Sequence, residues 1–376
     1  MIQPARCAPQ QHWDVIVCGA GPAGSALARR LAGRHRVLVV DRELPSGFTR
    51  TAQTWRIGES LPGSAAVLLR RQNLLERFLA DGHAERCASV SVWDSVEPVW
   101  FDALRDPAGP GWHLDRMRFD AMLRDAAHQA GAANATVRGR LEVQHDGTHW
   151  QLADEHSGAQ HRARVVVDAT GRNAALCRSL GLRRQAADDL VCVHVLLAAQ
   201  VDDVDRSTRT CADQDGWWYS VRVPSGERVL ACHLDADDPA LRELRNARVL
   251  LERARRLPLL AAVLPPDVGA AQTHVCPAGS VALDLSGCAQ RPGFYAVGDA
   301  VLAFDPLSSQ GLFHTLASAD SAASAIEGYL QGNDLAAHAY WSEMQQVQDR
   351  YFTHLAATYA GPVRHRERPF WARRLA

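Results

Sequence analysis

Residues 13–24, WDVIVCGAGPAG, decide the fold of this chain. The apolar run that ends at Cys18 predicts a buried parallel strand, and the glycine turn after it opens an alanine-rich helix. Gly19, Gly21 and Gly24 have the GxGxxG spacing. In such a turn the first glycine permits the tight bend, the second lets the backbone approach a pyrophosphate, and the third lets helix and strand pack closely.

An acidic residue follows at the position that a nucleotide site requires. A second apolar strand, residues 37–40, ends at Asp41. A carboxylate there can accept hydrogen bonds from ribose hydroxyls, while the N–H groups of the preceding helix attract phosphates. A glycine turn without a ligand is the alternative, but strand, helix and acid together predict a dinucleotide site. Its expected residues are Gly19, Gly21, Pro22, Ala23, Gly24, Asp41 and Arg42.

Composition limits the class of protein. The 376 residues are 47% hydrophobic, which is enough for two domains with cores of their own, and the formal net charge is −1. Neither a basic block, a signal peptide nor an 18-residue apolar run is present, so we expect a cytoplasmic protein without a membrane span or a nucleic-acid partner. All 41 basic residues are arginine, which excludes any mechanism that needs lysine. The nine cysteines show no metal-binding spacing, so no metal is expected.

Two later segments indicate that the bound dinucleotide is FAD rather than NAD. Residues 165–172 read VVVDATGR; residues 294–300 read FYAVGDA and are followed by DPLSSQGL at 305–312. Each segment is an apolar strand that ends in a turn with an acid. A carboxylate at Asp299 can bind the ribityl chain of a flavin. A helix that opens near Gly311 can point its N–H groups at the flavin N1–C2 carbonyl, which gains negative charge on reduction.

In this order and spacing the three motifs resemble the FAD domains of aromatic hydroxylases, flavin halogenases and geranylgeranyl reductases. The resemblance spans residues 13 to about 330. It implies that Asp299 contacts the ribitol, that Pro306 lies near the isoalloxazine and that the amides of Leu312 and Phe313 face flavin O2. Ser308 departs from the hydroxylases, which often have glycine there. The other FAD residues expected from these segments are Asp168, Gly171, Gly298 and Gly311.

Narrower resemblances indicate which branch of these flavoproteins the chain is similar to. Residues 56–62 (RIGESLP) and 114–120 (LDRMRFD) are similar to segments of the halogenase-like branch. Three segments, 216–220 (GWWYS), 305–311 (DPLSSQG) and 368–374 (RPFWARR), are similar to flavoproteins that modify tryptophan residues of a partner protein during maturation of tryptophylquinone cofactors. The resemblance places Arg116 at FAD, and Arg56 and Ser60 are further expected FAD residues. The expected catalytic residues are Glu59 and His314, and the aromatic residues Trp217, Trp218 and Tyr219 are expected at the substrate.

Each of these assignments has a structural alternative. Glu59 could be a carboxylate near the start of the following helix, and Arg116 could pair with a neighbouring aspartate. Residues 217–219 could be sheet core rather than a substrate cage. His314 could be structural, as expected for His113, His194 and His233; it is the histidine to test because it sits one turn into the helix that faces the flavin.

We therefore expect an α/β fold: a Rossmann-like FAD-binding domain of the hydroxylase or glutathione-reductase-2 type, an inserted antiparallel β-sheet substrate domain and a helical C-terminus. The FAD-binding domain is predicted to be discontinuous, at residues 1–85, 112–188 and 276–335. The predicted substrate domain comprises 86–111 and 189–275, and the C-terminal helical tail comprises 336–376.

The expected reaction is hydroxylation. Flavin halogenases rely on a lysine to handle hypohalous acid, and this chain contains none and lacks a WxWxIP segment. Reduced flavin and O2 form a C4a-hydroperoxide, which transfers oxygen to an electron-rich ring when water is excluded. The prediction is an FAD-dependent monooxygenase, reduced by NAD(P)H or a separate flavin reductase. Its substrate is expected to be an indole-like small molecule or a tryptophan in a peptide or protein. A dehydrogenase or oxidase, a flavin halogenase and a flavin-carrying assembly protein are the alternatives.

Overall fold

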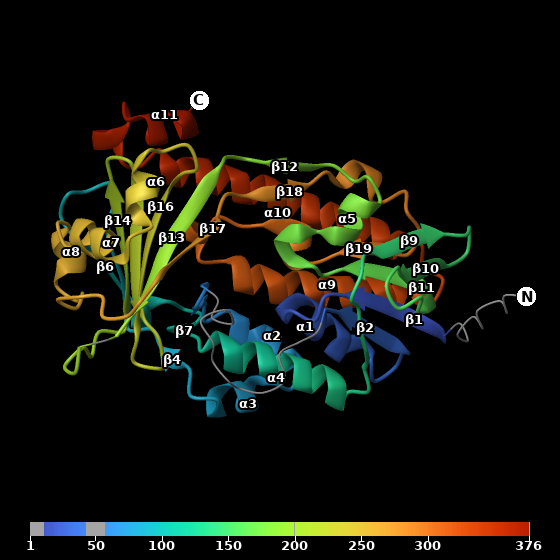
Figure 1. Ribbon diagram of the computed structural model, residues 1–376. Coiled ribbons are helices and arrows are strands. Elements are labelled where there is room, and N and C mark those ends of the chain that lie inside the picture. Colours follow the sequence, from blue (N-terminus) through green and yellow to red (C-terminus); the bar gives the residue numbers. More distant parts are fainter. Residues whose placement is uncertain (1–10, 43–56, 199, 376) are drawn as a thin grey trace, which may run out of the picture.

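The computed structural model describes residues 11–42, 57–198 and 200–375 (Figure 1). Its first large sheet is Rossmann-like, with strand order β8-β2-β1-β11-β10-β9 and with β19 also paired to β11. The strands are β1 (Gln11–Cys18), β2 (Val37–Asp41), β8 (Ala133–Thr136), β9 (Leu141–His145), β10 (Trp150–Asp154), β11 (Gln160–Asp168) and β19 (Phe294–Ala296). The expected fold class is confirmed.

Strand β11 holds this sheet together. Its first half pairs antiparallel with β10, its second half pairs parallel with β19, and its other edge pairs parallel with β1 along the whole strand. Cys18 of β1 lies opposite Asp168 of β11, which lies opposite Ala296 of β19. The carboxyl ends of the parallel strands therefore meet at one edge of the sheet, where ligands of doubly wound folds bind.

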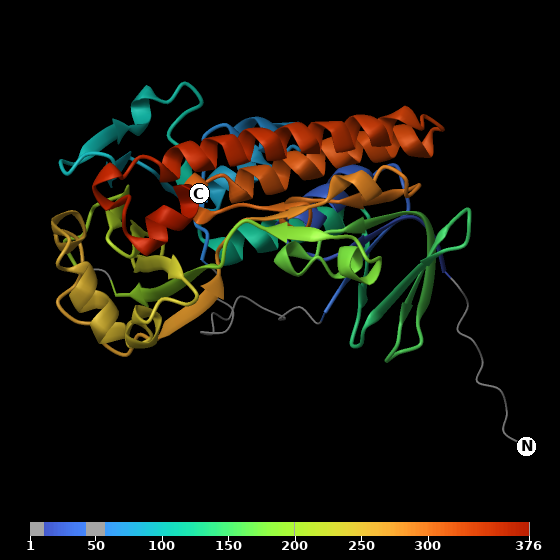
Figure 2. The same cartoon turned by 90° about the horizontal axis from the view of Figure 1, so that it is seen from above.

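Three helices form one packed layer. Helix α1 (Pro22–Leu31) contacts both α4 (Arg116–Gln129) and α9 (Gly311–Leu330). Helix α10 (Leu335–Tyr359) runs back alongside α9, and the two long helices lie side by side when the molecule is seen from above (Figure 2). The N-terminus of α4 is capped by Asp115, whose carboxylate accepts the amides of Met117 and Arg118, as expected for an aspartate at this position.

The second large sheet has the order β17-β13-β16-β15-β14-β5-β6. All neighbours are antiparallel except β14 and β5. Residues 88–102, far away in the sequence, thus complete the sheet formed by residues 190–277. Its strands are β5 (Ala88–Val92), β6 (Val99–Asp102), β13 (Leu190–Leu197), β14 (Ser207–Asp213), β15 (Gly216–Arg222), β16 (Arg228–Asp235) and β17 (Thr273–Pro277).

Helices cover the two faces of this sheet differently. Its first face packs against α6 (Ala240–Leu244), α7 (Ala247–Ala254) and α8 (Pro258–Ala261) through leucines such as Leu250 and Leu260. On its second face, Trp217 packs with the end of α10 and with α11 (Pro369–Leu375), which contributes Trp371. Successive side chains of a strand point to opposite faces, so Trp218 belongs to the first face.

Smaller elements connect these parts. Two three-stranded sheets have the orders β3-β7-β4 and β12-β18-β20. Their strands are β3 (Ser60–Leu61), β4 (Ala84–Glu85), β7 (Trp112–His113), β12 (Arg184–Ala186), β18 (Val281–Leu283) and β20 (Leu302–Ala303). Short helices are α2 (Ala65–Arg71), α3 (Leu75–Ala80) and α5 (Ala175–Ser179), with 3₁₀ turns at Ala103–Arg105, Gly171–Asn173, Leu285–Gly287, Gly298–Ala300, Pro306–Ser308 and Val363–His365.

Three segments are more broken than the apolar pattern indicates. The helical pattern of residues 61–79 forms two helices, because Asn73 takes a left-handed φ of 54° between α2 and α3. The extended pattern of residues 90–101 covers parts of two strands, β5 and β6, with a turn between them. The pattern of residues 239–257 splits at Asn246, whose side chain caps α7. Across the described parts of the chain, none of the helices has the length and apolarity needed to cross a bilayer.

Candidate active site

A large cavity opens at the carboxyl edge of the Rossmann-like sheet and extends to the second sheet. Its volume is about 1350 Å³, larger than the ~300–1,000 Å³ of an ordinary small-molecule pocket. One end is lined by the turn after β1 and the end of β2, and the other by Trp217, Tyr219 and His233 of the second sheet. The cavity therefore has room for an extended dinucleotide together with a second ligand.

The glycine turn has the geometry that a pyrophosphate requires. Gly19 has a φ of +112°, and a Cβ there would lie 2.2 Å from the carbonyl oxygen of Ala169. A Cβ on Gly24 would lie 1.9 Å from the carbonyl oxygen of Gly19. A Cβ on Gly21 would meet nothing within 4 Å. Gly19 and Gly24 thus permit close packing, while Gly21 leaves space in the cavity wall where α1 begins.

Asp41 stands at the end of β2 with its carboxylate held in place. One oxygen accepts the amide of Ala20 and the other accepts the amide of Arg42, both at 2.6 Å. Asp41 and Arg42 line the cavity together with Pro22. Each carboxylate oxygen has a further lone pair, so Asp41 can also accept hydrogen bonds from ribose hydroxyls.

The cavity wall carries an excess of positive charge among the described residues. Its six arginines outnumber its four acids: Arg42, Arg116, Arg138, Arg140, Arg172 and Arg178 against Asp41, Glu59, Asp299 and Asp305. Such an excess suits a diphosphate.

Arg116 combines the two roles that the sequence left open. Its Nε donates to Asp120 at 3.2 Å, so it does pair with a neighbouring aspartate. Its Nη1 donates to the carbonyl of Gly58 at 2.9 Å and to that of Ile57 at 3.3 Å. Arg116 also lines the cavity. It therefore ties the segment before Glu59 to α4 while presenting its charge to the site.

Helix α9 begins at the cavity. Gly311, Leu312, Pro306 and Asp299 all line the wall, and the 20-residue helix has no side-chain cap at its N-terminus. The first N–H groups of an α-helix lack partners within the helix, and its N-terminus carries a partial positive charge. The start of α9 can therefore stabilise negative charge on a bound ring system. Phe313 points into the core next to it.

Together, the residues that line the cavity fit FAD. The cavity is long enough, a glycine turn leaves room for the pyrophosphate, Asp41 is available for the ribose, and the uncapped start of α9 meets the opposite end. The residues that would hold FAD are those at the turn after β1, Asp41, Arg116, Asp299 and the first turn of α9. Bound there, FAD supplies redox chemistry and activation of O2.

Glu59 lies buried in the cavity wall. It is 2% exposed, and among the described residues neither carboxylate oxygen has a side-chain hydrogen-bond partner. Burial raises the pKa of Glu59, and backbone hydrogen bonds at Glu59 and Gly58, together with the nearby charge of Arg116, oppose that shift only in part. Its neighbour Ser60 also lines the cavity. A buried carboxylate with a raised pKa is suited to accept a proton from a bound ligand.

The structure separates the three aromatic residues expected at the substrate. Trp217 and Tyr219 line the cavity, and Trp217 stacks on His233 with ring centroids 3.6 Å apart. Trp218 lies on the opposite face of the sheet, where its Nε1 donates to Asp213. Two of the three residues thus meet the ligand space and the third is core.

Several other expected residues lie behind the wall. His314 is buried and stacks on Phe304 with ring centroids 4.8 Å apart, and burial lowers its pKa to about 4. The Asp168 carboxylate accepts the amides of Thr170 and Cys177 and so holds the turn after β11. Gly298 approaches Ala23 closely, whereas Gly171 and Ala23 line the cavity. Arg56 lies outside the described residues.

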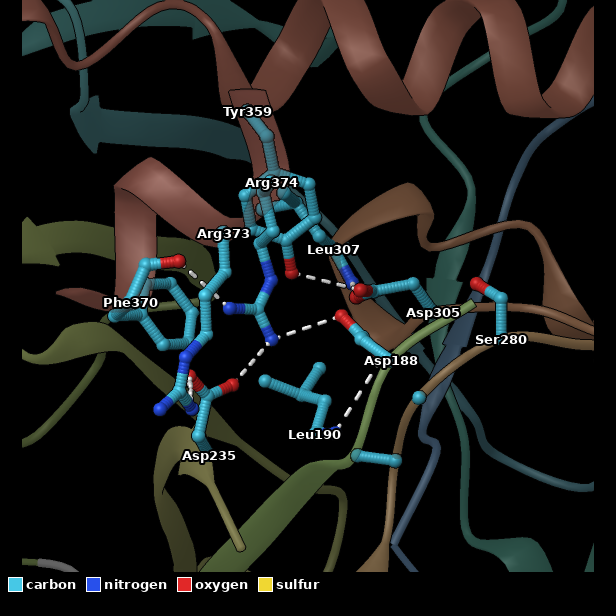
Figure 3. A network of polar contacts seen from close by, with 12 residues as sticks. Asp188, Leu190, Asp235, Ser280, Asp305, Leu307, Tyr359, Phe370, Arg373 and Arg374 are labelled. Atoms are coloured by element: carbon cyan, nitrogen blue, oxygen red, sulfur yellow. Dashed lines mark hydrogen bonds and ion pairs between the residues drawn. The ribbon is translucent and has the colours of Figure 1, made fainter. Parts of the chain in front are cut away.

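A hydrogen-bonded chain of three residues links the substrate sheet to the loop before α9, and sequence reasoning missed it. Trp217 Nε1 donates to the Tyr359 hydroxyl at 3.2 Å, which donates to Asp305 Oδ2 at 2.7 Å. Figure 3 shows Tyr359 reaching Asp305 from the end of α10. Burial raises the pKa of Asp305 to about 6. No local pattern marks Tyr359, because its partners are distant in the sequence.

The C-terminus is clamped onto the same region. Arg374 of α11 forms ion pairs with Asp188 and Asp235, at 2.8 and 2.7 Å, and lies over the ring of Phe370 (Figure 3). Arg172, another residue that was missed, donates to the carbonyls of Ala278 and Phe304 at the cavity wall. These arginines fix the orientation of the loops around the cavity.

Comparison with known proteins identifies the family. The tryptophan halogenase family model matches residues 101–375. The FAD-dependent oxidoreductase LodB of Marinomonas mediterranea is 26% identical over 373 residues, which cover 97% of this chain and 98% of LodB. Among solved structures, the flavin-dependent halogenase CmlS has a TM-score of 0.78 at 24% identity, over 97% of this chain and 68% of that one.

A second solved structure is the peptidyl tryptophan dihydroxylase QhpG, with a TM-score of 0.74 at 23% identity, over 96% of this chain and 78% of that one. At these identities the two structures show a common fold. The family model, by contrast, covers most of the sequence. This chain belongs to the tryptophan halogenase family and is an FAD-dependent oxidoreductase.

Proposed function

We propose that this protein is an FAD-dependent monooxygenase that hydroxylates an indole-like ring, either free or as a tryptophan side chain of a peptide or protein. One observation carries the proposal: a single cavity joins a dinucleotide turn to a wall that presents Trp217, Tyr219 and the buried carboxylate of Glu59. The chain has no lysine with which to handle hypohalous acid.

The residues of the wall would have distinct roles. Trp217 and Tyr219 would hold the substrate ring by stacking and edge contacts, which are favourable between aromatic groups. The Glu59 carboxylate would accept a hydrogen bond from the indole N1–H and would take the ring proton that leaves after oxygen transfer. Bound FAD, when reduced, supplies activated oxygen. The start of α9 would stabilise negative charge on the reduced ring system.

The known proteins support this proposal and also name its competitor. QhpG, described as a peptidyl tryptophan dihydroxylase essential for tryptophylquinone cofactor biogenesis, shares the fold over nearly the whole chain. CmlS is described as a flavin-dependent halogenase, and the family model that matches is that of tryptophan halogenases. Halogenation is therefore the second candidate, favoured by the family and opposed by the absence of lysine.

The product's mass decides between these reactions. The FAD-loaded protein would be supplied with NAD(P)H and a flavin reductase, O2, bromide and an indole or a tryptophan-containing peptide. Hydroxylation adds about 16 mass units per oxygen, and dehydrogenation removes about two. Bromination gives the paired isotope pattern of bromine. A brominated product, or dehydrogenation alone, would refute the monooxygenase. Omitting the reductase shows whether NAD(P)H reduces the protein directly.

Glu59→Gln tests the role of the carboxylate. The substitution keeps size and hydrogen-bonding capacity but removes the proton acceptor, so we expect turnover to fall by about 10²–10⁴-fold. FAD content should remain that of the wild type, because the proposal assigns Glu59 to the substrate and the substitution leaves the glycine turn and Asp41 unchanged. Glu85→Gln, the same substitution at an exposed glutamate of β4 that is not among the residues lining the cavity, is the control.

A further inference from the structure

We propose that Cys192, His194 and Cys276 form a binding site for one borderline-soft metal ion, with Zn²⁺ as the chemical type. The Cys192 thiol, the imidazole and the Cys276 thiol each offer one ligand atom, and these atoms all lie within 4.8 Å of one another. The site is independent of the reaction proposed above, since it stands on the arrangement of three donors in two strands.

The sheet brings the donors together. Cys192 and His194 are two residues apart in β13, so both side chains point to the same face. Cys276 of the neighbouring strand β17 lies directly opposite Cys192 and shares that face. The two strands run side by side where the second sheet meets the rest of the molecule (Figure 1). Because Cys276 lies 84 residues after Cys192 and 82 after His194, spacing in the sequence could not show the three donors together.

The distances match a tetrahedral ion. With Zn–S of about 2.3 Å and Zn–N of about 2.0 Å, sulfur and nitrogen ligands lie about 3.6 Å apart and two sulfurs about 3.8 Å apart. The Cys192 sulfur lies 3.8 Å from Nδ1 of His194. Two thiolates and one imidazole are the ligand types that zinc prefers, and three protein ligands leave a fourth position for water or substrate.

The strand register favours an ion over a disulfide. Val191 lies opposite Pro277, which has no N–H, and Leu190 accepts the amide of Ala278. Since hydrogen-bonded and non-hydrogen-bonded pairs alternate along antiparallel strands, Cys192 and Cys276 form a hydrogen-bonded pair, the more widely spaced kind. Opposite Cβ atoms lie about 4.5–5.5 Å apart, but a disulfide needs about 3.8 Å. A bridging ion spans that gap without moving the strands.

The site is accessible to an ion. Cys192 and Cys276 both line the large cavity, and His194 is buried next to them. An ion can therefore enter from the cavity. Both cysteines bind Zn²⁺ as thiolates, so Zn²⁺ binding should strengthen as the pH rises.

Metal titration of the reduced FAD-loaded protein tests the proposal. We expect one Zn²⁺ per chain by elemental analysis, and tetrahedral Co²⁺ bands at wavelengths beyond flavin absorption. Replacing a residue that only supports a metal ligand weakens metal binding by about 10–100-fold. Cys192→Ser and Cys276→Ser each replace a ligand itself, so each should weaken Zn²⁺ binding at least tenfold. Cys232→Ser, which removes a buried thiol from the opposite face of adjacent β16, should leave binding unchanged.

Bound-flavin absorbance shows that each variant is folded, so a loss of Zn²⁺ with retained FAD is specific. Zn²⁺ binding that is equal in Cys276→Ser and in the wild type would overturn the proposal. So would a Cys192–Cys276 disulfide found by peptide mapping of protein kept free of oxygen. Neither result depends on which product the enzyme forms, so the metal site and the monooxygenase stand or fall separately.

Discussion

Replacing Tyr359 with phenylalanine tests the link between the substrate sheet and the loop before α9. The hydroxyl accepts from Trp217 Nε1 and donates to Asp305 Oδ2. Its removal leaves two buried groups without that partner. An unsatisfied buried group costs about 1–3 kcal/mol, so Tyr359→Phe, which leaves two, should lower the free energy of unfolding by about 2–6 kcal/mol near neutral pH.

The loss should depend on pH. Burial raises the pKa of Asp305 from 3.8 to about 6, so its protonated form favours the fold. This contribution is fully present below the unfolded pKa and is lost as pH rises through about 6, in total about 3 kcal/mol. Ionised Asp305 needs the Tyr359 donor most. The penalty of the substitution should therefore grow between about pH 5 and pH 8.

Urea unfolding at both pH values, followed by release of bound flavin and by circular dichroism, measures this dependence. Tyr340→Phe is the matched control, since Tyr340 is another buried tyrosine of α10, whose hydroxyl donates to the carbonyl of Ala296 at 2.6 Å. Its penalty should be the same at both pH values. Equal, pH-independent penalties in the two variants would refute the reasoning.

Three further predictions concern the backbone and the wall. Gly24→Ala should abolish FAD binding or folding, because its Cβ would lie 1.9 Å from a carbonyl oxygen; Gly33→Ala, with open space around it, should bind FAD normally, and equal behaviour would contradict this. Ser309 has a φ of +51°, which glycine adopts more easily than a residue with a side chain. The free energy of unfolding of Ser309→Gly should therefore equal that of the wild type or exceed it by up to about 1 kcal/mol. A free energy of unfolding more than about 1 kcal/mol below the wild type would contradict strain at this residue. Trp217→Leu should raise KM for an indole substrate at least tenfold with FAD content unchanged; an unchanged KM would remove Trp217 from the substrate wall.

The sequence predicts the Rossmann-like half of the molecule well, because that half is built from local patterns. The strand that ends at Cys18, the helix that opens at Pro22 and the helix from Gly311 to Leu330 all occur where the apolar runs and glycine turns place them. Each of these elements is specified by consecutive residues, so no knowledge of distant contacts is needed.

The rest depends on contacts between distant segments. Trp217 and Tyr219 lie on one face of β15 and Trp218 on the other. All three residues are aromatic, so the sequence does not show which face lines the cavity; that depends on how the sheet packs. Tyr359 meets Asp305 only because α10 folds back along α9. The cluster of Cys192 and Cys276 likewise needs the register of β13 against β17.

Isotopic labelling tests the central claim most directly. The FAD-loaded protein would be reduced without oxygen, mixed with an indole or a tryptophan-containing peptide, and exposed to ¹⁸O₂. The account predicts a product whose mass rises by about 18 units for each inserted atom, with the label on the aromatic ring. A product that carries no label, or one that carries a halogen instead, would contradict it.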